Sequence, residues 1–342
     1  MNYIFSHEGT NTQSKIDILI LCFILFSILS FGQEKMNGLS FVASNTPISD
    51  KEILPVKQIN ANWVALMPFA FVKSEAETNI IYNSKRQWWG ETKIGISKSA
   101  IAFHKQKIKT MLKPQIWIPN GGFTGHIDMK SEFDWIAFET NYEKFILDYA
   151  QLAQENDIEL FCIGTELNVF VNKRTDFWNK LIVKIRKIYK GKITYAENWD
   201  TYKSVPFLDD LDYIGVDAYF PLSPEKTPSK SILENSWKPI KAEIKALSSK
   251  HKKPILFTEF GYQSKDFTGK EPWEHSNKNA LNLEAQNKTL SVLFSTFWKE
   301  KWFAGGFLWK WYDDYQQSGG EKDTDYTVQN KPSEAIVKKQ YR

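Results

Sequence analysis

The sequence predicts an α/β fold, a single (β/α)8 TIM barrel, and three observations lead to it. Short apolar runs of the length of a buried strand recur along the chain. They alternate with segments whose apolar residues have helical three-to-four spacing, as expected for a parallel sheet with crossover helices. A chain of 342 residues, 42% of them hydrophobic, can form such a barrel as one domain. A doubly wound open sheet is the alternative, and the absence of Gly-x-Gly-x-x-Gly after the early strands weakens it.

Eight apolar runs are the predicted strands, and they cover residues 38–43, 63–69, 115–118, 160–163, 192–196, 213–217, 254–260 and 303–309. The last run contains Gly305 and Gly306, which would allow a close approach of neighbouring backbone. The predicted helices lie at about 97–112, 138–156, 178–188, 230–249 and 283–299, with one more after Lys331-Pro332.

The N-terminal segment predicts export. Ile18 to Phe31 is a nearly uninterrupted apolar run, short for a membrane span and suitable for a signal-peptide core. Small residues at Ser30 and Gly32 place the cleavage after residue 32. Residues 1–32 are thus a signal peptide, or alternatively a retained anchor, and 33–342 are the barrel. The mature protein is expected to be secreted, periplasmic or at the cell surface, and only a retained anchor would bind it to a membrane.

Composition argues against several classes of protein. The net charge of +4 is spread along the chain without a basic tract, so nucleic acid is not an expected partner. Cys22 and Cys162 suggest neither a disulfide nor a metal site, and His104 and His126 lack metal-ligand spacing. We expect no cofactor and no metal, and we expect a monomer.

Two glutamates stand at the ends of predicted strands. Glu166 follows the run at 160–163, and Glu259 ends the run that begins at Pro254; both are preceded by threonine. The carboxyl ends of all barrel strands open onto one face, so both side chains should meet there. Two such carboxyl groups suit cleavage of a glycosidic bond, in which one must be protonated and the other ionised.

Five motifs in barrel order resemble glycoside hydrolase family 113, a member of the large clan A of retaining glycosidases. They are G-T-E-L-N (164–168), A-E-N-W-D (196–200), G-V-D-A-Y-F-P-L (215–222), T-E-F-G-Y (258–262) and G-F-L-W-K-W (306–311). The resemblance implies an endo-acting β-1,4-mannanase, with Glu166 as acid/base and Glu259 as nucleophile. Many clan members carry asparagine just before the acid/base, whereas this chain has Thr165.

Aromatic residues near the strand ends are candidate sugar contacts, because rings with a polar handle can stack on sugar faces. Trp309 is expected to lie under the reacting sugar, with barrel packing as the alternative. Trp199, beside Asn198, is expected to face the substrate rather than to form a turn and a core contact. Trp88 and Trp89 are candidates for outer subsites.

Two polar residues follow the run at 213–217. Tyr219 is expected to donate a hydrogen bond to the nucleophile carboxylate. Asp217 fits two roles equally well, a hydrogen-bonding scaffold at the barrel mouth or a direct ligand of the sugar.

The expected function is hydrolysis of a β-1,4-linked polysaccharide or oligosaccharide by double displacement. Two alternatives remain from the sequence: another specificity on the same barrel, such as a β-glucanase or an exo-β-mannosidase, and a barrel that only binds polysaccharide. Only the enzyme needs both glutamates. Strands four and seven face each other across a narrow barrel, so the two carboxyl groups should be about 5–5.5 Å apart, the retaining separation.

Overall fold

Eight parallel strands close into a barrel in this computed structural model, which describes residues 1, 34–85, 87–275 and 278–342. The strands are β1 (Met36–Phe41), β2 (Trp63–Leu66), β4 (Lys109–Leu112), β6 (Leu160–Thr165), β7 (Lys192–Asn198), β8 (Tyr213–Asp217), β9 (Ile255–Phe260) and β10 (Phe303–Trp311). Around the barrel their order is β1-β10-β9-β8-β7-β6-β4-β2. The predicted (β/α)8 fold is confirmed.

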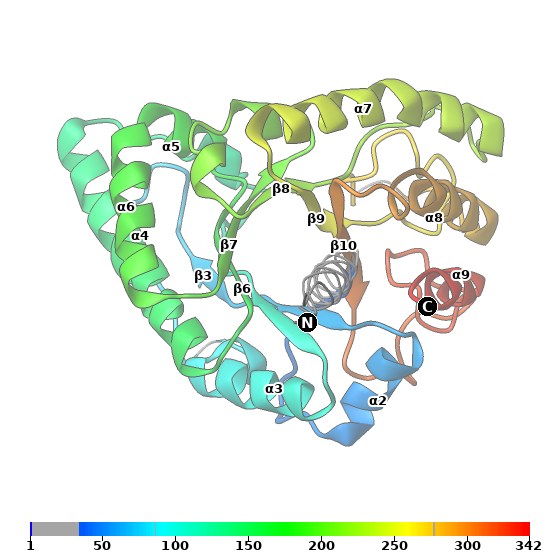
Figure 1. Cartoon of the computed structure of the whole chain (residues 1–342), viewed down its shortest axis with the longest axis horizontal. Helices are drawn as coiled ribbons and strands as arrows, with labels where there is room; N and C mark the ends of the chain where they lie inside the picture. Colours follow the sequence, from blue (N-terminus) through cyan, green and yellow to red (C-terminus); the bar gives the residue numbers. More distant parts are fainter. Residues whose placement is uncertain (2–33, 86, 276–277) are drawn as a thin grey trace. The chain divides into compact units, whose positions relative to one another are not determined.

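Helices surround this ring of strands, as Figure 1 shows. They are α2 (Asp50–Gln58), α3 (Lys93–Lys105), α4 (Glu132–Glu155), α5 (Asn168–Lys173), α6 (Thr175–Ile188), α7 (Lys230–His251), α8 (Leu283–Phe297) and α9 (Pro332–Gln340). Local signals set several of their ends. Ser131 caps α4 by accepting from the Asp134 N–H at 3.1 Å, and Pro332 occupies the first turn of α9, where its missing N–H costs nothing.

The predicted third strand was wrong. The barrel uses Lys109–Leu112 as β4, whereas Gln115–Trp117 forms β5 in a separate two-stranded sheet with β3 (Phe69–Phe71). The helix predicted through residue 112 ends at Lys105, and Lys107 then adopts a left-handed φ of 61°. No glycine marks the end of this helix, and Ile108 and Met111 continue its apolar spacing. The sequence pattern therefore gave no sign that the helix ends at Lys105.

The barrel interior is filled by side chains, and it therefore forms a core rather than a pore. Its apolar members are Met36, Trp63, Ala65, Met67, Met111, Leu160, Cys162, Ala196, Tyr213, Leu256, Ala304 and Phe307. A larger apolar cluster contains residues from both strands and helices. Gly38 is required where Phe307 packs, because a Cβ there would lie 2.4 Å from the Phe307 ring.

Residues 35–342 form one compact unit. The predicted signal peptide rests on residues 2–33, which lie outside the described residues. Within the described part of the chain, no helix combines the length and the apolar character needed to cross a bilayer.

Candidate active site

A cavity of about 500 Å³ is lined by residues that follow several different strands of the barrel. Its lining consists of Phe123, Glu166, Asn198, Trp199, Asp200, Tyr219, Glu259, Trp273, His275, Trp309 and Tyr326. Both glutamates singled out in the sequence are among them. The carboxyl ends of parallel barrel strands open on one face, which explains how residues so distant in sequence meet.

Glu166 is the first residue after β6, and its backbone has a left-handed φ of 50°. This conformation is costly for a residue with a Cβ and is found at functional sites. The Glu166 N–H donates to the Ala196 carbonyl at 2.8 Å, which ties the turn to β7. Among the described residues, none makes a hydrogen bond with the Glu166 carboxyl group, which therefore stays available to a ligand.

Glu259, in β9, has both carboxylate oxygens held. Its Oε1 accepts from Lys113 Nζ at 2.5 Å and from Gln115 Nε2 at 3.2 Å. Its Oε2 accepts from the Tyr219 hydroxyl at 2.8 Å. These donors stabilise the ionised carboxylate and fix its orientation.

Lys113 is fully buried between two carboxyl groups. Its Nζ lies 3.1 Å from both oxygens of Asp217, whose Oδ1 also accepts from Thr258 Oγ1 at 2.7 Å. Burial alone would lower the pKa of the Lys113 ammonium, but Asp217 and Glu259 raise it above its ordinary value. Lys113 therefore supplies a permanent positive charge behind Glu259.

The charges around Glu166 favour its protonated form. Burial raises the pKa of Glu166 well above its ordinary value, and the negative charges of Asp217 and Glu259 raise it further, against the opposing effect of Lys113. Burial and the charge of Glu259 also raise the pKa of Asp217, to about 7. The cavity thus contains Glu166, whose surroundings favour the protonated form, and Glu259, whose two oxygens accept hydrogen bonds from neighbouring side chains.

A second buried glutamate, Glu197, organises the turns that carry the cavity residues. Its Oε1 accepts from the Asn198 N–H and the Thr201 hydroxyl, both at 3.0 Å. Its Oε2 accepts from the Tyr195 hydroxyl at 3.1 Å, and this hydroxyl accepts from the Leu167 N–H at 2.7 Å. The network links the turn after β6 to the turn after β7. Burial raises the pKa of Glu197.

Several aromatic rings line the same cavity as the two glutamates. Trp309 lies in β10, the neighbour of the strand that carries Glu259. Trp199 follows β7 and stacks on Trp273, with ring centroids 5.1 Å apart and planes 19° from parallel. Trp273 lies in the segment between β9 and α8 and is 39% exposed.

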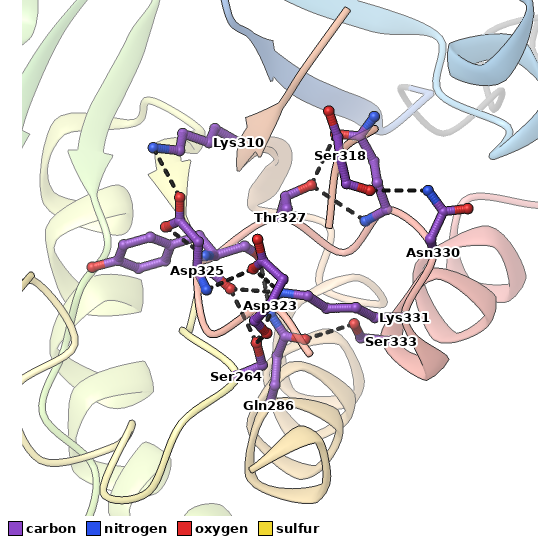
Figure 2. Close-up of polar contacts among 12 residues, drawn as sticks. Ser264, Gln286, Lys310, Ser318, Asp323, Asp325, Thr327, Asn330, Lys331 and Ser333 are labelled. Atoms are coloured by element: carbon purple, nitrogen blue, oxygen red, sulfur yellow. Dashed lines mark hydrogen bonds and ion pairs between the residues drawn. The ribbon is translucent and has the colours of Figure 1, made fainter. Parts of the chain in front are cut away.

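The segment between β10 and α9 is fixed by a buried ammonium, shown in Figure 2. Lys331 Nζ lies 2.8 Å from each of three oxygens, which belong to the Ser264 hydroxyl, the Asp323 carboxylate and the Asp325 backbone. Lys310 reaches the Asp325 carboxylate at 3.2 Å. This network fixes the segment that brings Tyr326 into the lining of the cavity.

Three predicted site residues do not line the cavity. Asp217 is only 1% exposed and contacts Lys113, so its position matches the scaffold alternative. Trp88 and Trp89 lie at the 3-10 turn Trp89–Glu91 between β3 and α3 and are not part of the lining.

Thr165, the residue just before Glu166, has a buried hydroxyl without a hydrogen-bond partner in the described part of the chain.

Several residues of the site were missed in the sequence. Lys113 and Gln115, which contact Glu259, were hidden by the misplaced third strand; a lysine directly after Met111-Leu112 was the available signal. Trp273, His275 and Tyr326 come from long irregular segments, whose sequence carries no such signal. Among the described residues, no group of three or more histidine, cysteine, aspartate or glutamate side chains is arranged to hold a metal ion.

A closed barrel of eight parallel strands with two glutamates in a cavity at its carboxyl ends is an architecture of glycoside hydrolases. The protein is a glycosidase of this class. The chain belongs to Glycoside Hydrolase Family 113, whose family model matches residues 30–331.

Solved structures of that family share the fold. A GH113 β-1,4-mannanase complex superposes with a TM-score of 0.79 at 23% identity, covering 90% of this chain and 99% of the other. The GH113 β-mannanase AaManA from Alicyclobacillus acidocaldarius, in complex with ManMIm, gives 0.78 at 23% identity, covering 90% and 97%. A Ruminococcus gnavus β-glucuronidase is more distant, with a TM-score of 0.55 at 13% identity, covering 85% and 46%. No curated protein sequence matches the chain.

Proposed function

We propose that this protein is an exported, retaining endo-β-1,4-mannanase that hydrolyses mannan or manno-oligosaccharides. The unequal surroundings of two carboxyl groups in one cavity carry the proposal. Burial and negative neighbours favour the proton on Glu166, whereas Lys113, Gln115 and Tyr219 hold the charge of Glu259. Carboxyl groups whose surroundings differ in this way are suited to act as acid and as nucleophile.

In the first step, a Glu259 oxygen attacks the anomeric carbon while Glu166 gives its proton to the glycosidic oxygen, whose bond to that carbon breaks. In the second step, Glu166 takes a proton from water, and the water oxygen displaces Glu259 from the same carbon. Lys113 is a positioning residue for Glu259, and Asp217 holds Lys113. Trp309 supports the reacting sugar, and Asn198 and Trp199 contact the substrate.

The sugar and the export have separate support. Mannan is favoured by membership in family 113 and by the β-mannanases of that family among the structures of the same fold. Export is favoured by the apolar run from Ile18 to Phe31, which has the length of a signal-peptide core.

A polysaccharide panel with analysis of product lengths tests the function. Linear β-1,4-mannan should release a series of short manno-oligosaccharides, and cellulose and xylan should release much less. Glu259→Ala, in a folded protein, should abolish release. Release of mannose alone would point to exo action, preference for cellulose would point to a glucanase, and binding without cleavage would leave only a polysaccharide-binding barrel.

A further inference from the structure

We propose that Tyr195 is a positioning residue for Glu166, because its hydroxyl holds the backbone turn that carries the proposed general acid. The inference rests on the proposed function and deepens it. Tyr195 is 1% exposed and lies outside the cavity lining, so it acts through Glu166 and not on the substrate.

The position of the Glu166 carboxyl group depends on its backbone. The oxygens of Glu259 accept from three side chains, whereas no group among the described residues makes a hydrogen bond with the Glu166 carboxyl. The Glu166 backbone has a left-handed φ of 50°, which is costly for a residue with a Cβ. Such a conformation persists only where the surrounding structure holds it.

Acceptors on β7 hold the turn on both sides of the Glu166 Cα. The Glu166 N–H donates to the Ala196 carbonyl at 2.8 Å, and the next N–H along the chain, that of Leu167, donates to the Tyr195 hydroxyl at 2.7 Å. Leu167 is buried, so without the hydroxyl its N–H would be a buried donor with no partner. That cost would favour a different turn and would move Glu166.

The Tyr195 hydroxyl is fixed both in place and in direction. Its ring packs edge-on against Trp178 and Phe207, each at 5.5 Å between centroids. The single hydroxyl proton is donated to Glu197 Oε2 at 3.1 Å, which leaves a lone pair for the Leu167 N–H. Burial and the negative charge of Glu197 raise the pKa of the Tyr195 phenol well above its ordinary value, so the hydroxyl keeps this proton.

Gly164, two residues before Glu166, allows the Tyr195 ring to come this close. A Cβ at Gly164 would lie 2.8 Å from Cε2 of the Tyr195 ring and 2.7 Å from the hydroxyl oxygen of Tyr142. The glycine ahead of Glu166 and the tyrosine on β7 therefore form one contact, which sets the distance between the two strand ends.

The position of Glu166 matters most for a sugar leaving group. A general acid must come within hydrogen-bond reach of the oxygen that it protonates, and a misplacement of about 1 Å can cost roughly 100-fold in rate. A leaving group that departs without a proton needs little help from the acid. A displaced Glu166 should therefore slow the two kinds of substrate unequally.

Tyr195→Phe tests the inference, because it removes the hydroxyl and keeps the ring. The substrates are mannopentaose, with a sugar leaving group, and 2,4-dinitrophenyl β-mannobioside, whose phenolate departs unprotonated. The variant should lower kcat/KM for mannopentaose by roughly 10- to 100-fold and leave kcat/KM for the aryl glycoside within about threefold. A purely structural role would lower both values by the same factor, through the fraction of folded enzyme.

Tyr189→Phe is the matched control. Tyr189 is as buried as Tyr195, and its hydroxyl also bonds the backbone near β6, donating to the Ile158 carbonyl at 2.6 Å. Ile158 lies two residues before β6 begins, at the end of the strand opposite to Glu166. In this variant kcat/KM should stay at the wild-type level on both substrates. Thermal unfolding should show that both variants are folded at the assay temperature.

The outcomes separate the inference from the proposed function. Equal losses on both substrates in Tyr195→Phe, or no loss on either, would overturn the role of Tyr195 and leave the proposed function standing. If Tyr195→Phe is unfolded, Glu197→Gln takes its place, because a neutral amide is a weaker acceptor for the Tyr195 proton; equal losses in that variant would also overturn the inference. If the wild-type protein cleaves neither substrate, the proposed function fails and this inference fails with it.

Discussion

Lys113 is a buried residue that affects several carboxyl groups of the site. Its ammonium contacts Glu259 and Asp217. The same positive charge lowers the pKa of Glu166, but burial and the negative charges of Asp217 and Glu259 raise that pKa by more. Replacing one member of a buried ion pair leaves the other charge uncompensated, so the contacts of Lys113 with Asp217 and Glu259 are sensitive to mutation.

The first prediction concerns Glu166. Because a general acid matters most for a poor leaving group, Glu166→Ala should lose most activity on mannan and retain much of it on an aryl mannoside with a good leaving group. The variant should then accumulate the glycosyl-enzyme, and added azide should speed its release as a β-glycosyl azide. Equal losses on the two substrates without any azide product would contradict the acid/base role.

The second prediction is a pH shift. As the proposed general acid, Glu166 must carry its proton, so activity should fall as pH rises through the pKa of Glu166. The charge of Asp217 helps to raise that pKa, so Asp217→Asn should move the basic limb of kcat/KM to lower pH. The limb is measured on one soluble substrate from about pH 4, near the ordinary pKa of a glutamate, upward until activity is lost.

Asp200→Asn is the control for this shift. Asp200 lines the same cavity, yet the charges that raise the pKa of Glu166 come from other residues. Its basic limb should coincide with that of the wild type. If the basic limb does not move in Asp217→Asn, or moves equally in both variants, the charge of Asp217 does not specifically raise the pKa of Glu166.

At the scale of elements, an irregular segment is held by hydrogen bonds to one buried ammonium. The segment between β10 and α9 carries Tyr326 to the cavity, and Lys331 contacts oxygens of Ser264, Asp323 and Asp325 from within it. Burial lowers the pKa of Lys331, against the opposing effect of Asp323. Three oxygens share this one ammonium, so the segment depends on it for its conformation.

The third prediction follows from that ammonium. Lys331→Met removes a charged donor from three buried or half-buried oxygens and should lower the free energy of unfolding by roughly 1.5–3 kcal/mol. Lys339→Met, an exposed change in α9, should have little effect. Denaturant unfolding monitored by fluorescence measures both. Equal stability of the two variants would show that the network contributes nothing to the fold.

At the scale of the whole molecule, barrel closure decides where the two glutamates stand. β6 and β9 are separated by two strands on one side of the ring and by four on the other, so Glu166 and Glu259 approach one cavity from different sides. A narrow barrel favours the retaining separation of about 5–5.5 Å over the roughly 6.5–9.5 Å that an inverting enzyme needs for its water.

The fourth prediction is therefore stereochemical. Hydrolysis of a β-linked manno-oligosaccharide should first give the β-anomer, because two displacements at the anomeric carbon restore its configuration. Proton NMR of the first product, recorded before mutarotation, measures this. An initial α-anomer would exclude a covalent intermediate on Glu259, whatever sugar the enzyme prefers.

The sequence by itself determined the alternation of strands and helices, the barrel, and the two threonine-glutamate strand ends. These features are local: an apolar run, a helical spacing or a residue just past a strand is visible within a few positions. Glu166 and Glu259 were accessible in this way because the fold class fixes where every strand end points.

The tertiary structure alone decided what surrounds those glutamates. The end of α3 carries no glycine, so β4 and the lysine after it were misplaced until the helix was seen to end at Lys105. Trp199 and Trp273 are far apart in the chain and stack only because the segment after β9 folds back over the barrel mouth. Side-chain contacts between irregular segments depend on three-dimensional closure, and no periodic pattern in the sequence encodes them.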